Sequence, residues 1–198
     1  AILAMDTARS LHKPFYLYLS HYAIHVPLEP DHRFYQKYKD QGLPESEARY
    51  ASMIESMDKS LDDILHYVDE KGIAENTIII FMSDNGGLSA QARAGKAHTH
   101  NAPLNSGKGS AYEGGIREPM LVRWPGVTKA GSSCNQYIII EDFFPTILSL
   151  ANVKAAKKVQ HVDGISFTGL LKNPQTKRSS RNLYWHFPNN WGPAGPGI

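Results

Sequence analysis

Three stretches of the chain carry a regular pattern of hydrophobic positions. In the segment Glu45–Lys71, apolar side chains recur at steps of three and four residues, which predicts an amphipathic helix. Pro44 precedes this segment and Gly72 follows it, as is typical of the two ends of a helix. The apolar stretches Phe15–Ser20 and Thr77–Ser83, one on each side of the helix, predict buried strands. This order predicts a crossover between two parallel strands.

The rest of the pattern predicts shorter elements separated by long loops. We expect a helix up to residue 12, strands at 120–124, 136–140 and 183–187, a helix at 141–151 and a short packed element at 165–171. Loops cover residues 21–43 and 84–111. Loops of this length inside a compact domain are usually functional or disordered, so both are places to search for a site.

Composition narrows the class of protein. The chain has 198 residues, 41% of them hydrophobic, which suits one domain with a core. No apolar run approaches the roughly 18 residues of a membrane span, so we expect no membrane partner. The net charge of +2 is too small to indicate nucleic-acid binding. The single cysteine, Cys134, excludes an internal disulfide framework and is expected to be an inert thiol.

Charge is distributed unevenly, and the segment 91–123 is locally basic. A net positive loop suits an anionic substrate, because it raises the local concentration of anions. The alternative is an ordinary solvated loop. The charged residues are Arg93, Lys96, Lys108, Arg117 and Arg123 against Glu113 and Glu118, and His98 and His100 add to them.

Two short motifs carry candidate chemistry. Asp84 and Asn85 directly follow a predicted strand, at the carboxyl edge where α/β sheets bind ligands. Their side-chain oxygens suit a hard cation such as calcium or magnesium, although a simple turn after the strand would use the same residues. Lys108 lies between two glycines, which let its backbone and ammonium approach a ligand closely. The alternative is an exposed loop lysine.

These motifs resemble those of one enzyme family. The segment 84–86 reads Asp-Asn-Gly, and 107–117 reads Gly-Lys-Gly-Ser-Ala-Tyr-Glu-Gly-Gly-Ile-Arg, followed by Glu118-Pro119. Upstream, an apolar strand leads into His25-Val26-Pro27. In this order the three resemble the type I sulfatases, formylglycine-dependent enzymes of the alkaline-phosphatase superfamily. The resemblance extends over nearly the whole chain.

The resemblance implies an α/β fold, with a mixed and largely parallel sheet of the alkaline-phosphatase type flanked by helices. It implies that Lys108 contacts the sulfate and that His25 protonates the leaving oxygen, a role that suits histidine because it titrates near neutral pH. Asp84 and Asn85 are implied ligands of one divalent cation, calcium or alternatively magnesium. We assign His98, His100 and Asn101 to possible contacts with the organic part of the substrate.

Parts of the family pattern are missing. Neither Cys134 nor any serine lies in the Cys/Ser-x-Pro-x-Arg motif that yields the formylglycine nucleophile, and the first pair of metal-binding aspartates is absent. Asn105 stands where many relatives carry arginine before the glycine-flanked lysine. We therefore interpret 1–178 as the C-terminal part of a partial catalytic domain and 179–198 as the start of a truncated segment. The N-terminal remainder would be its partner, and the piece alone is expected to be inactive.

The resulting functional hypothesis is hydrolysis of sulfate esters, on a sulfated glycan or an aryl compound, by the complete protein. One rival is a phosphatase or phosphodiesterase of the same superfamily, which usually binds two metals. Another is a glycan-binding relative that has lost its nucleophile. By analogy with the family we expect a periplasmic or secreted enzyme.

Overall fold

A computed structural model describes residues 1–87, 101–153 and 160–186. The chain divides into two compact units. Within the described residues, the first contains Ala1–Ala74 and Ser83–Pro119, and the second contains Glu75–Met82 and Met120–His186. The candidate residues that the structure describes all belong to the first unit. The predicted division at residue 178 stays a prediction.

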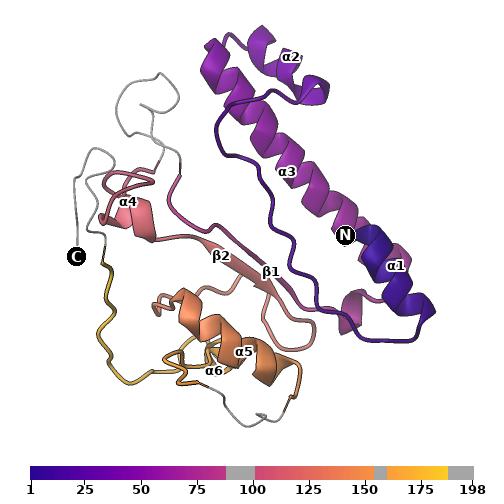
Figure 1. Cartoon of the computed structure of the whole chain (residues 1–198), viewed down its shortest axis with the longest axis vertical. Helices are drawn as coiled ribbons and strands as arrows, with labels where there is room; N and C mark the ends of the chain where they lie inside the picture. Colours follow the sequence, from indigo (N-terminus) through magenta and orange to yellow (C-terminus); the bar gives the residue numbers. More distant parts are fainter. Residues whose placement is uncertain (88–100, 154–159, 187–198) are drawn as a thin grey trace. The chain divides into compact units, whose positions relative to one another are not determined.

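The first unit is built on one long helix. α3 (Glu45–Glu70) confirms the predicted helix to within one residue at its end, with Pro44 before it and Glu45 and Glu47 in its first turn, where carboxylates interact favourably with the helix dipole. α2 (His32–Asp40) packs against α3, as Figure 1 shows. α1 (Ile2–Ser10) is tied to the other end of α3, because the hydroxyl of Tyr67 donates to Asp6 at 2.6 Å.

The predicted buried strand at Phe15–Ser20 was wrong. Within the described ranges these residues form no ladder, and Tyr16 and Tyr18 are 70% and 79% exposed. A buried strand needs partners for its backbone groups and cover on both faces. The segment has neither among the described residues, so the predicted parallel crossover through α3 is not formed.

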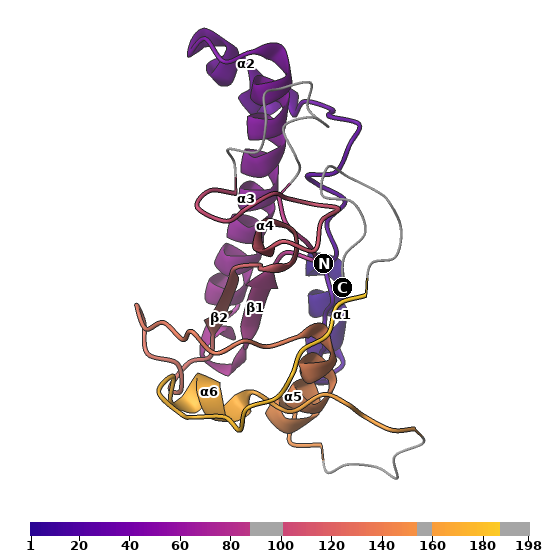
Figure 2. The ribbon, with the colours of Figure 1, turned by 90° about the vertical axis from the view of Figure 1, so that its left-hand side faces the viewer.

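The second unit contains β1 (Ile79–Met82) and β2 (Met120–Arg123), which fall within two predicted strands. They pair antiparallel, with Ile79 opposite Arg123 and Met82 opposite Met120, and Figure 2 shows them side by side. The expected partner of β1 was a parallel strand, so this pairing corrects the predicted local topology. It is the only ladder in the part of the chain that the structure describes.

The second unit also contains helices, which follow β2 along the chain. A short 3-10 helix, η3 (Ile140–Asp142), leads into α5 (Phe143–Leu150), which packs on α6 (Thr168–Lys172). The predicted strands at 136–140 and 183–187 are not formed where the structure describes them. The rings of Phe143 and Phe167 meet edge to face at 5.2 Å, and Phe167 is almost fully buried. The remaining short elements are η1 (Ala74–Asn76), which precedes β1 and begins at the last residue of the first unit's segment Ala1–Ala74, and α4 (Glu113–Ile116) in the first unit.

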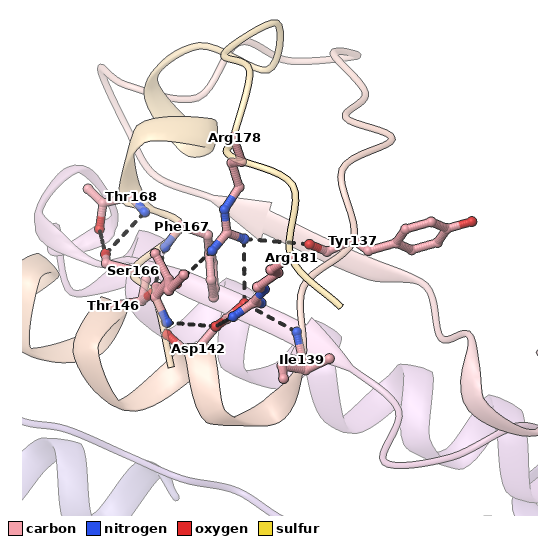
Figure 3. Close-up of polar contacts among 10 residues, drawn as sticks. Tyr137, Ile139, Asp142, Thr146, Ser166, Phe167, Thr168, Arg178 and Arg181 are labelled. Carbon is pink, nitrogen blue, oxygen red and sulfur yellow. Dashed lines mark hydrogen bonds and ion pairs between the residues drawn. The ribbon is translucent and has the colours of Figure 1, made fainter. Parts of the chain in front are cut away.

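Asp142 holds the second unit together from within. Its carboxylate is fully buried and accepts from the backbone N–H of Ile139 (Figure 3). It also accepts from the backbone N–H of Ile165. Arg181 pairs with both carboxylate oxygens, at 2.9 Å to Oδ1, and Arg178 adds a contact at 3.4 Å. One buried carboxylate therefore links α5 to the extended segment that follows α6.

None of the helices in the described residues combines the length and the apolar composition that a membrane crossing requires.

Candidate active site

The turn that follows β1 places Asp84 and Asn85 beside each other. The hydroxyl of Ser83 donates to the carbonyl oxygen of Asn85 at 2.9 Å, which closes the turn. The amide nitrogen of Asn85 donates to Oδ1 of Asp84 at 2.6 Å. That bond uses the amide nitrogen of Asn85 and one carboxylate oxygen of Asp84. Among the described residues, the amide oxygen of Asn85 and the second carboxylate oxygen of Asp84 have no hydrogen-bond partner.

Oxygen is the ligand atom that a hard cation prefers, but these two oxygens are fewer than such a cation needs. Calcium takes six to eight oxygen ligands, and two side chains supply only part of that set. Among the described residues there is no group of three or more histidine, cysteine, aspartate or glutamate side chains that would hold a metal. The turn has the donor chemistry of a partial cation site, and further ligands would have to come from elsewhere.

A second loop lies directly against this turn. The N–H of Lys108 donates to the carbonyl oxygen of Gly87 at 3.1 Å, and the N–H of Gly86 donates to the carbonyl oxygen of Gly115 at 3.0 Å. The structure therefore brings together the two motifs that the sequence separates by about twenty residues. The ammonium of Lys108 has no ion-pair partner within the described ranges, and the backbone of Lys108 is bonded to Gly87, two residues after Asn85.

The close approach depends on glycine. A β-carbon on Gly86 would lie 2.7 Å from the Cα of Gly115, and it would overlap the carbonyl oxygen of Gly114. A β-carbon on Gly107 would lie 2.9 Å from the carbonyl oxygen of Gly87. Real β-carbons do not approach other atoms this closely, so the glycines are required by packing of backbone on backbone.

Asn101 lies between the two loops. Its Oδ1 accepts from the N–H of Gly87 at 3.1 Å, and its Nδ2 donates to the carbonyl oxygens of Gly87 and Ser106, both at 3.2 Å. Sequence reasoning placed Asn101 among possible substrate contacts. In the structure both of its amide hydrogens are used within the protein. His98 and His100 lie outside the described residues, and their assignment stays a prediction.

His25 is positioned by its own loop. Its Nδ1 lies 2.7 Å from the carbonyl oxygen of Val26, and its ring meets the edge of Tyr22 at 6.1 Å. Because a carbonyl oxygen only accepts, Nδ1 carries the hydrogen in this contact, which leaves Nε2 for another partner. No hydrogen bond or ring contact joins His25 to Asp84 or Lys108 in the part of the chain that the structure describes.

Two further residues, one in the loop 21–43 and one in the second motif, make local contacts. Nε2 of His21 lies 3.3 Å from the hydroxyl of Ser60 on α3, so His21 packs against the helix. Arg117 forms an exposed ion pair with Glu113 at 3.3 Å.

Sequence reasoning missed Glu118. Burial, and after it the carboxylate of Asp84, raise the pKa of Glu118 to about 7. Its Oε1 is buried and has no hydrogen-bond partner among the described residues. The only available signal was its place directly after the Arg117 that ends the second motif. An acidic residue beside the implied cation ligands increases the negative potential there.

The sequence is similar to a known protein family and to several of its members. A family model described as Sulfatase matches residues 2–153. A sulfatase from Formosa agariphila is 35% identical over 189 residues, which cover 88% of this chain and 33% of the relative. N-acetylgalactosamine-6-sulfatase from Rattus norvegicus is 37% identical over 155 residues, which cover 76% of this chain and 28% of the relative.

The fold is also similar to those of solved protein structures. Ps i-CgsB in complex with k-i-k-neocarrahexaose superposes with a TM-score of 0.76 at 31% identity, covering 87% of this chain and 37% of that one. The PsFucS1 sulfatase from Pseudoalteromonas sp. gives a TM-score of 0.72 at 29% identity, covering 89% and 34%. The chain thus spans about a third of the length of these proteins. The likeness supports the expected α/β fold of the alkaline-phosphatase type as a partial domain.

Proposed function

The chain belongs to the sulfatase family, and from that premise we propose that the complete protein hydrolyses sulfate esters. The observation that supports the proposal is the backbone contact between Gly87 and Lys108, because it joins the chain segment of the Asp84 and Asn85 turn to the chain segment that carries Lys108. A sulfate ester is an anion whose departing oxygen is a poor leaving group. Its hydrolysis needs positive charge around the sulfur-bound oxygens and a proton for the oxygen that leaves.

In the proposed mechanism Lys108 holds the sulfate. Its ammonium is a compact charge with three donors, and no carboxylate in the described residues neutralises it. In this role the ammonium would stabilise the charge that grows on the sulfate oxygens in the transition state. Asp84 and Asn85 would contribute two ligands of one divalent cation, calcium or alternatively magnesium, which supplies further positive charge when bound.

His25 is proposed as the proton donor to the leaving oxygen. The contact of Nδ1 with the Val26 carbonyl oxygen fixes the orientation of the ring and leaves Nε2 as the exchanging atom. The nucleophile is the formylglycine that the family uses, and it would lie in the N-terminal remainder, outside this chain. His98, His100 and Asn101 are candidates for contacts with the organic part of the substrate.

We propose a sulfated carbohydrate as the substrate class. Similar proteins support this choice: one is named N-acetylgalactosamine-6-sulfatase, and another was solved in complex with k-i-k-neocarrahexaose. Other relatives are named arylsulfatase and steryl-sulfatase, so an aryl sulfate is a suitable reporter substrate. A periplasmic or secreted location, expected by analogy with the family, is part of the proposal. Fractionation of cells that express the complete gene tests the location.

The test compares paired substrates on the complete protein. We expect release of 4-nitrophenol from its sulfate ester at least about a hundredfold faster, in kcat/KM, than from its phosphate ester, a difference of about 2.7 kcal/mol in transition-state stabilisation. Sulfate release from sulfated oligosaccharides then ranks the natural substrates. A preference for phosphate would support the phosphatase alternative. Binding of the oligosaccharides without turnover would support a glycan-binding relative.

A further inference from the structure

The side chain of Asn101 joins the two halves of the proposed site. We propose that Asn101 is a positioning residue, which fixes the turn of Asp84 and Asn85 against the loop of Lys108. The inference rests on the proposed function, and it assigns Asn101 a role that does not require contact with the substrate.

One carboxamide spans both segments. On the first segment it accepts from the N–H of Gly87 and donates to the carbonyl oxygen of the same residue. On the second segment it donates to the carbonyl oxygen of Ser106, two residues before Lys108. The Gly87 carbonyl oxygen also accepts from the N–H of Lys108. Movement of either segment away from the other would break at least one of these bonds.

Two neighbouring glycines leave the space that the Asn101 carboxamide occupies. A β-carbon on Gly87 would lie 2.5 Å from Oδ1 of Asn101, and one on Gly107 would lie 2.7 Å from Nδ2. Glycine at both positions therefore makes room for the carboxamide. A carboxylate of the same shape would still accept from Gly87, but its second oxygen would face two carbonyl oxygens that it repels.

The backbone next to Lys108 is also held in an unfavourable conformation. Ser106 has a φ of 66°, in the left-handed region that residues with a β-carbon seldom adopt, and it is only 6% exposed. Such a conformation costs about 1–2 kcal/mol and persists only where surrounding contacts enforce it. The bond from Asn101 to the Ser106 carbonyl oxygen is one of those contacts. Its loss would let the loop relax and Lys108 shift.

A shift of this kind affects catalysis directly. The ammonium of Lys108 and the cation ligands must act on the same sulfate group, so their separation matters more than the stability of either loop. A displacement of about 1 Å can cost about a hundredfold in rate. A substrate contact through Asn101 would act differently, because only a lone pair of Oδ1 remains available, and its loss would raise KM.

The experiment uses the complete enzyme with Asn101→Asp and Asn101→Ala. Asn135→Asp, the same amide-to-acid change at an exposed residue, is the control. With 4-nitrophenyl sulfate we expect kcat to fall about a hundredfold in both Asn101 variants, with KM changed by less than about threefold. Calorimetry should show weaker calcium binding in the variants, and the control should match the wild type in all three quantities.

Three results would overturn the inference. Unchanged kcat in both variants would show that the hydrogen bonds of the Asn101 side chain are dispensable. A raised KM with unchanged kcat would show a substrate contact instead. The third result comes from the wild type and requires no variant to fold. The N–H groups of Gly87 and Lys108 should be protected from hydrogen exchange and should open together. Rapid, independent exchange of these two N–H groups would contradict the positioning role of Asn101 even if the protein has no sulfatase activity. The two proposals can therefore fail separately.

Discussion

Gly86 and Gly114 approach so closely that a β-carbon on Gly86 would overlap the carbonyl oxygen of Gly114. The turn after β1 therefore rests directly on the backbone at the start of α4, with no side chain between them. Gly86 is also bonded to Gly115 through its N–H, at 3.0 Å. The position of the Asp84 and Asn85 oxygens depends on this contact between two backbone segments.

Replacement of Gly86 by alanine should destabilise the protein. The added carbon meets backbone, which cannot rotate away, so we expect the free energy of unfolding to fall by at least about 3 kcal/mol, the upper end for overpacking. Gly169→Ala is the matched control, because a β-carbon there meets nothing within 4 Å and the residue lies in α6. It should be neutral or stabilising by about 1 kcal/mol. Equal unfolding midpoints in urea for both variants would contradict this packing.

Replacement of Lys108 by methionine removes the ammonium and keeps most of the side chain's apolar volume. In the complete enzyme we expect kcat/KM for 4-nitrophenyl sulfate to fall about a hundred- to a thousandfold, as for other groups that stabilise developing charge. The unfolding temperature should change little, since Lys108 makes no side-chain bond within the described residues. Lys129→Met, at an exposed lysine, should leave the kinetics unchanged. A variant of Lys108 that keeps full activity would remove it from the mechanism.

Replacement of Asp84 by alanine should weaken calcium binding to the complete protein by more than about tenfold, because affinity at oxygen sites follows the number of charged ligands. Asp58→Ala, an exposed change on α3, is the control for net charge. Calorimetry measures both. The 198-residue chain alone should bind calcium only weakly, since its turn offers too few ligands. Tight binding by this chain would show that the ligand set is already complete.

Asp142→Asn should lower the free energy of unfolding by about 3–5 kcal/mol. The change leaves Arg178 and Arg181 without their buried carboxylate, and breaking one side of a buried ion pair has a cost of this size. Asp163→Asn is the control, because its pair with His161 is 79–85% exposed and such pairs contribute about 0–1 kcal/mol. Urea unfolding of the two variants should separate them clearly. Similar losses would show that the Asp142 cluster is not a stabilising contact.

The same carboxylate predicts a dependence on pH. Burial by itself raises the pKa of Asp142, but hydrogen bonds from Arg181, Ile165 and Ile139 outweigh burial and lower the pKa below its ordinary value. A carboxyl whose pKa is lower in the folded state stabilises the fold above the unfolded pKa of about 4. That stabilisation is lost as the pH falls through the folded pKa. The gap in stability between the wild type and Asp142→Asn should therefore stay constant from pH 7 to about 4 and narrow as the pH falls further. A gap that stays constant in the acidic range as well would contradict the assignment.

Local patterns determined much of the fold. The three- and four-residue periodicity of the segment 45–71 located α3, since a helix satisfies its own backbone and needs only one apolar face. The apolar run that ends at Asp84 located β1. In each case the information lies within a few residues of the element it specifies.

Contacts between distant segments were decided only by the tertiary structure. The segment Phe15–Ser20 has the composition of a buried strand, yet a strand exists only where a second backbone accepts its hydrogen bonds, and none among the described residues does. The antiparallel pairing of β1 with β2 and the ion pairs of Asp142 with two arginines join residues far apart in sequence. The bond between Asn101 and Gly87 joins residues that no local pattern connects. Periodicity specifies how a segment coils and which face it buries. The choice of partner depends on which segments meet in space, and no local pattern encodes that.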